Sequence, residues 1–167
     1  MTGSVTRVLT PRPLTAAAFK PFGDVIEAAG TPLSINYGAT ARYHNLARIE
    51  VQDGRAIISL FRSSPVTLPF EIGVMENHPL GSQAFMPLSS HPYIVVVAPK
   101  GPFAAEKIEA FLAAPGQGVN FRPGTWHHYN LALEGISDFL VIDRDGAGDN
   151  CEEVTLAEPV ILSGGPS

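Results

Sequence analysis

Prolines recur through the middle of this 167-residue chain at the spacing of short strands, and they leave little room for long helices. Proline has no backbone N–H and a fixed φ, so it is confined to strand edges and turns. The runs between these prolines are rich in strand-forming residues. They span residues 56–61, 70–75, 83–87, 93–98 and 139–142. Many short strands with frequent turns predict an all-β sandwich or barrel.

Two stretches depart from this pattern and favour helix. In residues 15–19, Thr15 is a suitable N-cap before three alanines. Residues 104–113 carry three apolar residues at helical spacing and end before Pro115-Gly116. The sequence therefore predicts a mainly antiparallel β-barrel with a few short helices, the second of which covers the barrel.

Composition limits the class of protein. The chain is 45% hydrophobic with a net charge of −5, which suits one domain over residues 1–167. No Lys/Arg cluster resembles a nucleic-acid footprint. The apolar run 93–98 is far too short to cross a membrane, and residues 1–10 lack the apolar core of a signal peptide. The single cysteine, Cys151, permits a cytoplasmic location, and its acidic neighbours oppose thiolate formation.

Two segments far apart in the chain, 76–85 and 118–128, combine histidines with Gly and Pro turn residues. In the first, Glu76 and His78 are two apart, so on a strand they share one face. Pro79 and Gly81 follow, and a hairpin there would return Gln83 to the same cavity. A β-barrel can bring two such segments to one pocket, and histidine there indicates proton transfer, a metal, or both.

The second segment has a Pro123-Gly124 turn followed by Trp126, His127 and His128. Neighbouring residues on a strand alternate faces. We therefore expect only one of His127 and His128 in the cavity, with the other outside or at a subunit contact.

This spacing resembles the cupin family, whose two motifs supply three histidines and a glutamate to one divalent metal. By that resemblance Glu76, His78, Gln83 and His127 occupy the four ligand positions. The resemblance implies an optional divalent metal such as nickel, zinc or manganese. Because Glu76 replaces a histidine and Gln83 replaces the carboxylate, we expect weaker binding than in a standard cupin.

A more specific resemblance extends from about residue 14 to residue 151. It rests on five strings in the same order and spacing: Arg42-Tyr43-His44, 78–85, 116–120, Trp126-His127-His128, and 143–144 with 149–151. Together they resemble the ureidoglycolate lyase family. The resemblance implies a cupin-type barrel, a homodimer, and cleavage of (S)-ureidoglycolate to glyoxylate and urea in allantoin breakdown.

The residues can support that chemistry. Cleavage needs a base for the hydroxyl proton, an acid for the departing nitrogen and a cation for the carboxylate. Glu76, His78 and His127 are the candidate catalytic groups, since histidine titrates near neutrality. For substrate binding we expect Arg42 with His44 on one strand face, and also Gln83, Asn120 and Arg62. Asn120 suits a structural role equally well, and a surface role suits Arg62 better, since an arginine at a strand end is usually solvated. Guanidinium groups bind carboxylates with two parallel hydrogen bonds.

Two other readings remain open from the sequence. One is a metal-dependent cupin enzyme of different specificity, such as an oxygenase or isomerase. The other is a non-catalytic cupin that binds a small acid. Turnover of ureidoglycolate separates both from the lyase reading, and the product, urea or ammonia, separates a lyase from an amidohydrolase.

Overall fold

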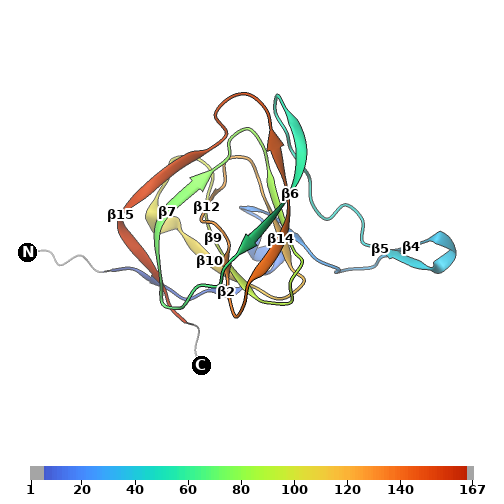
Figure 1. The fold of residues 1–167 in the computed structure, drawn as a ribbon, viewed down its shortest axis with the longest axis horizontal. Coiled ribbons are helices and arrows are strands. Elements are labelled where there is room, and N and C mark those ends of the chain that lie inside the picture. Colours follow the sequence, from blue (N-terminus) through green and yellow to red (C-terminus); the bar gives the residue numbers. More distant parts are fainter. Residues whose placement is uncertain (1–5, 165–167) are drawn as a thin grey trace, which may run out of the picture.

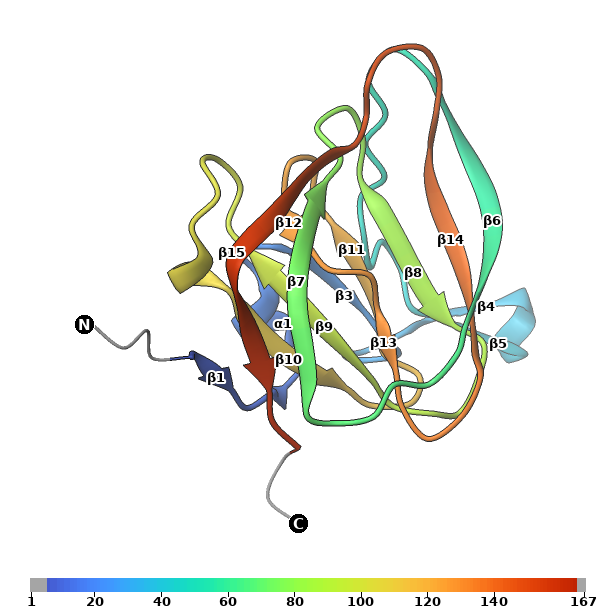
Figure 2. The ribbon, with the colours of Figure 1, turned by 60° about the vertical axis from the view of Figure 1, so that its left-hand side comes forward.

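The computed structural model describes residues 6–164 and consists mainly of strands that curl into a half-barrel of two facing sheets (Figure 1, Figure 2). The larger sheet, sheet A, has eight strands. Its strands run in the order β1 (Val8–Leu9), β15 (Glu152–Leu162), β7 (Phe70–Asn77), β12 (Trp126–His127), β9 (Tyr93–Ala98), β10 (Glu109–Ala113) and β2 (Arg12–Pro13), while β13 (Leu131–Ala132) also pairs with β9. All pairings are antiparallel except β1 with β15 and β2 with β10.

The second sheet, sheet B, faces sheet A across the interior. Its five strands run in the order β3 (Gly23–Ile26), β11 (Gly118–Phe121), β8 (Gln83–Pro87), β14 (Ser137–Asp145) and β6 (Arg55–Ser63). All five predicted strand runs are present, and two of them, β8 and β9, keep the predicted bounds. The all-β, cupin-like fold is thus confirmed.

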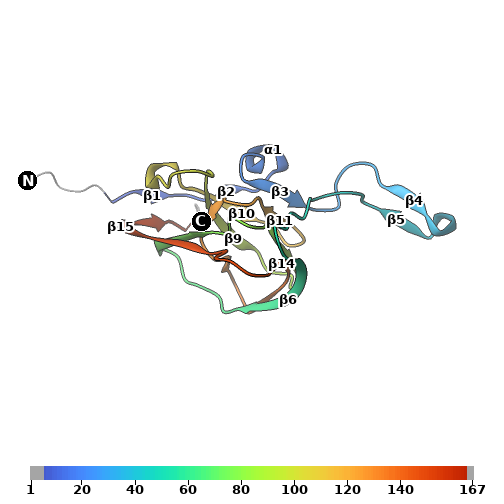
Figure 3. The same cartoon turned by 90° about the horizontal axis from the view of Figure 1, so that it is seen from above.

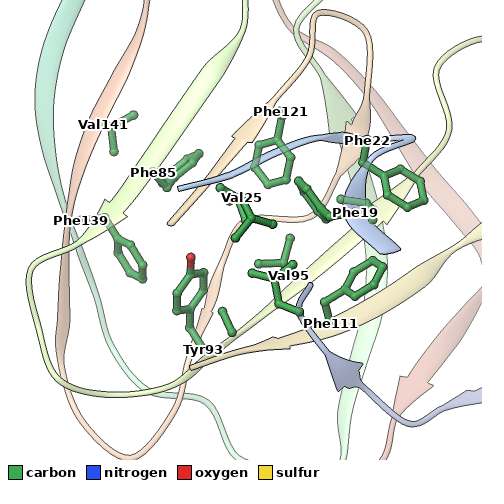
Figure 4. Packing of buried hydrophobic residues seen from close by; sticks show 14 residues of the cluster. Phe19, Phe22, Val25, Phe85, Tyr93, Val95, Phe111, Phe121, Phe139 and Val141 are labelled. Atoms are coloured by element: carbon green, nitrogen blue, oxygen red, sulfur yellow. The ribbon is translucent and has the colours of Figure 1, made fainter. Parts of the chain in front are cut away.

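The interior core consists largely of aromatic rings. Phe19 and Phe22 pack with Phe111, Phe121 and Phe85 into one cluster, in which neighbouring rings meet edge-on or tilted (Figure 4). Fully burying a side chain of this size stabilises the fold by about 1.5–3 kcal/mol. These rings come from both sheets and from the segment around α1, and together they hold the inner faces of the sheets against each other.

The predicted first helix is present as α1 (Ala16–Phe19), and the hydroxyl oxygen of Thr15 accepts a hydrogen bond from Ala18 N at 3.2 Å. The predicted helix over 104–113 is wrong. Only Ala105–Lys107 form a 3-10 turn, η2, and the rest is strand β10. The buried strand β9 offers β10 five consecutive pairing positions, and this non-local ladder outweighs the local helical spacing.

The segment between β3 and β6 leaves the barrel. Its strands β4 (Leu33–Ile35) and β5 (Thr40–Arg42) form a separate two-stranded sheet joined by the 3-10 turn η1 (Asn36–Gly38). In Figure 1 and Figure 3 this hairpin stands away from the barrel, on the side of β6 and β14. Within residues 6–164, no helix is long and apolar enough to span a membrane.

Candidate functional site

Three titratable side chains converge where the two sheets open. Glu76 lies near the end of β7, His78 follows that strand, and His127 lies on β12 directly opposite Glu76. His78 Nε2 is 3.9 Å and His127 Nδ1 is 4.0 Å from Glu76 Oε1. The potential ligand atoms of all three lie within 4.8 Å of one another. The two motifs predicted to meet therefore do meet.

A turn connects the two motifs directly. Gly124 N donates a hydrogen bond to the carbonyl oxygen of His78 at 3.0 Å. Gly124 has φ +80°, a left-handed conformation that glycine adopts without strain. The Pro123-Gly124 turn thus aligns β12 beside β7. The expected hairpin between Glu76 and Gln83 does not form, because the chain crosses there from sheet A to sheet B; Gln83 nevertheless lines the same cavity.

Backbone carbonyls orient both histidines. His78 Nδ1 lies 2.6 Å from the carbonyl oxygen of Asn150, and His127 Nδ1 lies 3.3 Å from that of His128. A carbonyl only accepts, so these contacts assign the proton to each Nδ1. Each Nε2 then keeps a free lone pair, and both Nε2 atoms are buried without a hydrogen-bond partner. Free Nε2 atoms with anchored Nδ1–H groups suit metal binding or proton acceptance.

His127 is held in an apolar environment. Its ring stacks on Phe121 with centroids 4.3 Å apart and planes 3° apart, and its side chain is 2% exposed. Burial, with a smaller contribution from His78, lowers the pKa of His127 to about 3. His127 is therefore neutral at physiological pH, which is the form that ligates metals and which makes it a weak base.

His128 follows β12 and lines the opening beside Glu76 and His127, although it is not one of the three clustered ligand residues. Its ring packs edge-on against Phe70, and Nδ1 contacts the carbonyl oxygen of Tyr129 at 2.8 Å. The expectation that His128 lies outside is wrong, because it is 2% exposed, while its place at a subunit contact stays a prediction. Burial lowers its pKa as well.

Gln83 extends the polar lining of the cavity, and Asp143 holds its side chain in place. Gln83 Nε2 donates to Asp143 Oδ2 at 3.2 Å, which leaves Gln83 Oε1 buried without a partner. With Glu76 and one ring nitrogen of each histidine, this oxygen gives a candidate donor set of two nitrogens and two oxygens. Such a set fits a divalent first-row metal, with the neutral amide as its weak member.

Two acidic residues next to the predicted site residues were not predicted from the sequence. Asp143 follows Phe139 and Val141 at every second position of β14, so strand alternation could have placed it inside. Glu153 on β15 lies directly opposite Glu76 and lines the same opening. Only the pairing of β15 with β7 reveals that neighbour.

Cys151 lies at the edge of the site. Its thiol donates to Glu76 Oε2 at 3.7 Å, and burial together with Glu76 raises its pKa. The surroundings of Cys151 therefore disfavour its thiolate form, as its acidic neighbours in the sequence predicted.

The other predicted substrate-binding residues lie elsewhere. Asn120 is on the opposite face of β11 from Phe121, where its amide donates to Asp24 and to the carbonyl oxygen of Arg48. Arg62 is exposed and forms a two-pronged ion pair with Asp138 at 2.8 and 3.0 Å. Arg42 and His44 belong to the exposed hairpin region.

Among the described residues, no Lys or Arg lines the cavity around Glu76 and His127. A separate open groove of about 620 Å³ beside Pro79 is lined by Arg48, Lys100 and Arg122. Two of these cations already face carboxylates, since Arg48 lies 3.9 Å from Glu50 and Arg122 lies 4.0 Å from Asp24.

Two curled sheets around a buried histidine pair and a glutamate define a cupin-like β protein with a candidate metal or acid–base site. Comparison with known proteins is more specific. The family profile described as "Ureidoglycolate lyase" matches residues 6–163, and the chain belongs to this family.

Individual relatives agree with the family match. A ureidoglycolate lyase from Burkholderia mallei (strain NCTC 10229) is 53% identical over 160 residues, which cover 94% of each chain. One from Pseudomonas syringae pv. syringae (strain B728a) is 48% identical, covering 93% of this chain and 94% of the relative. Another from Pseudomonas aeruginosa (strain LESB58) is 50% identical over 151 residues, covering 88% and 89%.

Proposed function

We propose that this chain is a lyase that cleaves (S)-ureidoglycolate into glyoxylate and urea, and that it acts in the breakdown of allantoin. The family match over residues 6–163 carries this conclusion. The relatives, which share 48–53% identity, bear the same name. We further propose that residues 1–167 act as one domain, located in the cytoplasm in keeping with its single cysteine.

The reaction requires two proton movements and no added water. The hydroxyl of the substrate loses its proton as the carbon–oxygen bond becomes a carbonyl, the carbon–nitrogen bond breaks, and the departing urea nitrogen gains a proton. Base and acid return to their starting states, so one small cluster of titratable groups suffices.

We assign the proton transfers to Glu76 and His78. His78 has a free Nε2, is 18% exposed and lies 3.9 Å from the Glu76 carboxylate, so the two can exchange a proton next to bound substrate. His127 contributes mainly as a neutral hydrogen-bonding group or ligand, because burial keeps it unprotonated. General acid–base groups of this kind contribute about 10²–10⁴-fold.

The same residues fit a cofactor. Glu76, His78, Gln83 and His127 would hold a divalent metal such as nickel, zinc or manganese, and the unpartnered Nε2 and Oε1 atoms support this proposal. A cation bound there would polarise the substrate's hydroxyl oxygen and lower its pKa. A proton and a metal compete for the Nε2 lone pairs. Activity that survives removal of all metal by a chelator would therefore favour a mechanism in which these side chains transfer protons without a bound metal.

The test is a product assay with purified protein and (S)-ureidoglycolate. We expect urea and glyoxylate in equal amounts, and at least about a tenfold lower rate for His78→Ala or Glu76→Ala with an unchanged fold. Ammonia as the product would replace the lyase with an amidohydrolase. No turnover at all would favour the small-acid-binding or other cupin functions, which the free donor set equally suits.

A further inference from the structure

The hairpin between β3 and β6 packs on little of its own chain. We define residues 28–47 as the arm. Three of its large apolar residues are exposed, with Leu33 at 52%, Tyr43 at 37% and Tyr37, at the tip, at 111%. Figure 1 and Figure 3 show β4 and β5 standing clear of the barrel. An isolated two-stranded hairpin is at best marginally stable in water. The arm therefore has the form of an element that packs on another molecule.

The charge of the arm complements the cavity. Within the arm, residues 28–47, the chain has one arginine, Arg42, and no acidic residue, although its net charge is −5. The opening of the cavity carries Glu76 and Glu153, which face each other across neighbouring strands without a described Lys or Arg beside them. Like charges placed so are unfavourable without a nearby cation, and an anionic substrate adds to that charge.

A second unpartnered surface lies on the other edge of sheet B, since the arm leaves from β3 and β6 is the strand at the far end of that sheet. On the outer face of sheet B, Ile58 and Leu60 of β6 are each 69% exposed and pair with Ile142 and Leu140 of β14. The inner face of this sheet is already packed in the core, so sheet B is apolar on both sides. Exposed apolar patches on a folded protein commonly mark interfaces.

Strand β6 connects this patch to the cavity. Ile58 and Leu60 point outward, whereas Phe61 and Ser63 on the same strand line the cavity. A molecule seated on the outer face of β6 thus lies one strand away from the opening. Ten extended residues of an arm span at most about 35 Å, several times the roughly 10 Å thickness of a β-sandwich.

We propose that two copies of this chain pair through the outer face of sheet B, and that the arm of each copy places Arg42 at the cavity of the other. A two-fold arrangement satisfies both unpartnered surfaces at once, because each copy offers the same patch and the same arm. Arg42 then supplies the planar cation for the substrate carboxylate that the cavity itself lacks. This assignment of the substrate cation rests on the proposed lyase function.

Complementation in mixed dimers tests the exchange of arms. Two differently tagged copies, one with Arg42→Ala and one with His127→Ala, are co-expressed and the mixed dimer is purified. Each homodimer is expected to lose at least about tenfold in kcat/KM. If the arm acts across the interface, one site of the mixed dimer has an intact barrel and an intact arm. The mixed dimer then recovers about half of the wild-type rate.

A mixed dimer of His78→Ala with His127→Ala is the matched control and stays at background, because both residues belong to the barrel. Background activity in the Arg42→Ala mixed dimer, or an Arg42→Ala homodimer with wild-type kcat/KM, overturns the proposal.

The oligomeric state provides a readout independent of turnover. We expect sedimentation to give a dimer for the wild type and a monomer for Leu60→Arg. The matched control is Leu112→Arg, which replaces a leucine on sheet A that is 40% exposed and should leave the dimer intact. If the wild-type protein released no urea, the lyase function would fail while this measurement still judged the interface. A wild-type monomer at micromolar concentration, or a dimeric Leu60→Arg, overturns the pairing.

Discussion

Replacing Gln83 by Glu tests both the contact with Asp143 and the metal site. In the wild type, the Gln83 amide donates to Asp143 Oδ2 at 3.2 Å inside the cavity, and Gln83 is 7% exposed. The variant Gln83→Glu removes that donor and sets two carboxylates against each other. At about 4 Å and an effective dielectric constant near 20, their repulsion is about 4 kcal/mol.

Proton uptake limits this cost. If one carboxyl group stays protonated at pH 7, the cost is that of raising its pKa from about 4.3 to 7, which is about 3.7 kcal/mol. The protonated group also restores a hydrogen bond to its neighbour. We therefore expect the free energy of unfolding without metal to fall by about 2–4 kcal/mol, or roughly 5–15 °C in Tm. This loss of stability should become smaller as the pH falls toward 5, because protonating one of the two carboxyl groups then costs less free energy.

A divalent metal should reverse the effect. A carboxylate at position 83 completes a stronger ligand set with Glu76, and metal at 100 times its Kd stabilises the folded state by about 2.7 kcal/mol. The assay is thermal unfolding of Gln83→Glu and wild type, each with a chelator and with nickel, zinc or manganese. Gln117→Glu is the matched control: the Gln117 amide donates to Glu27 Oε2 at 2.9 Å, and neither residue lines the cavity.

We expect Gln117→Glu to lose stability without any recovery by metal. A Gln83→Glu protein that melts within about 2 °C of wild type in chelator at pH 7 would refute the contact with Asp143. Equal rescue of both variants by metal would refute the metal site.

Two further predictions concern the imidazole cluster. Because burial lowers the pKa of His127 to about 3, well below its unfolded value near 6.5, the unfolded chain binds the extra proton between these values. Stability contributed by neutral His127 is complete above pH 6.5 and lost as the pH falls toward 3, by up to about 4 kcal/mol. His127→Gln should show a shallower decline of Tm over this range, and an identical decline would contradict the burial argument. Phe121→Leu keeps most of the core volume but removes the ring stacked on His127. We expect a loss in the free energy of unfolding below about 1.5 kcal/mol and about tenfold weaker metal binding, measured by calorimetry. Unchanged metal affinity would show that the ring does not position the imidazole.

Local sequence chemistry determined the strands and the meeting of the two motifs. Proline positions and β-branched runs are properties of the backbone and its neighbours, so β8 and β9 could be placed to the residue. Alternation along a strand predicted that only one of His127 and His128 enters the cavity, but β12 ends at His127 and both residues line the opening beside Glu76. The same rule sends Phe121 into the core, where it stacks on His127, and Asn120 to the other face of β11, so the strand position of Asn120 argues against its assignment to substrate.

Tertiary structure decided the remaining features, because each depends on a partner distant in the sequence. Residues 109–113 have helical spacing but become β10, since β9 offers a buried ladder that no local pattern reveals. Glu153 reaches Glu76 only through the pairing of β15 with β7. The residues around Arg42 predict a strand. The position of that strand away from the barrel depends on which distant segments it packs against, and local sequence does not specify this. Propensity and alternation act within a few residues, but register and burial are set by the whole chain.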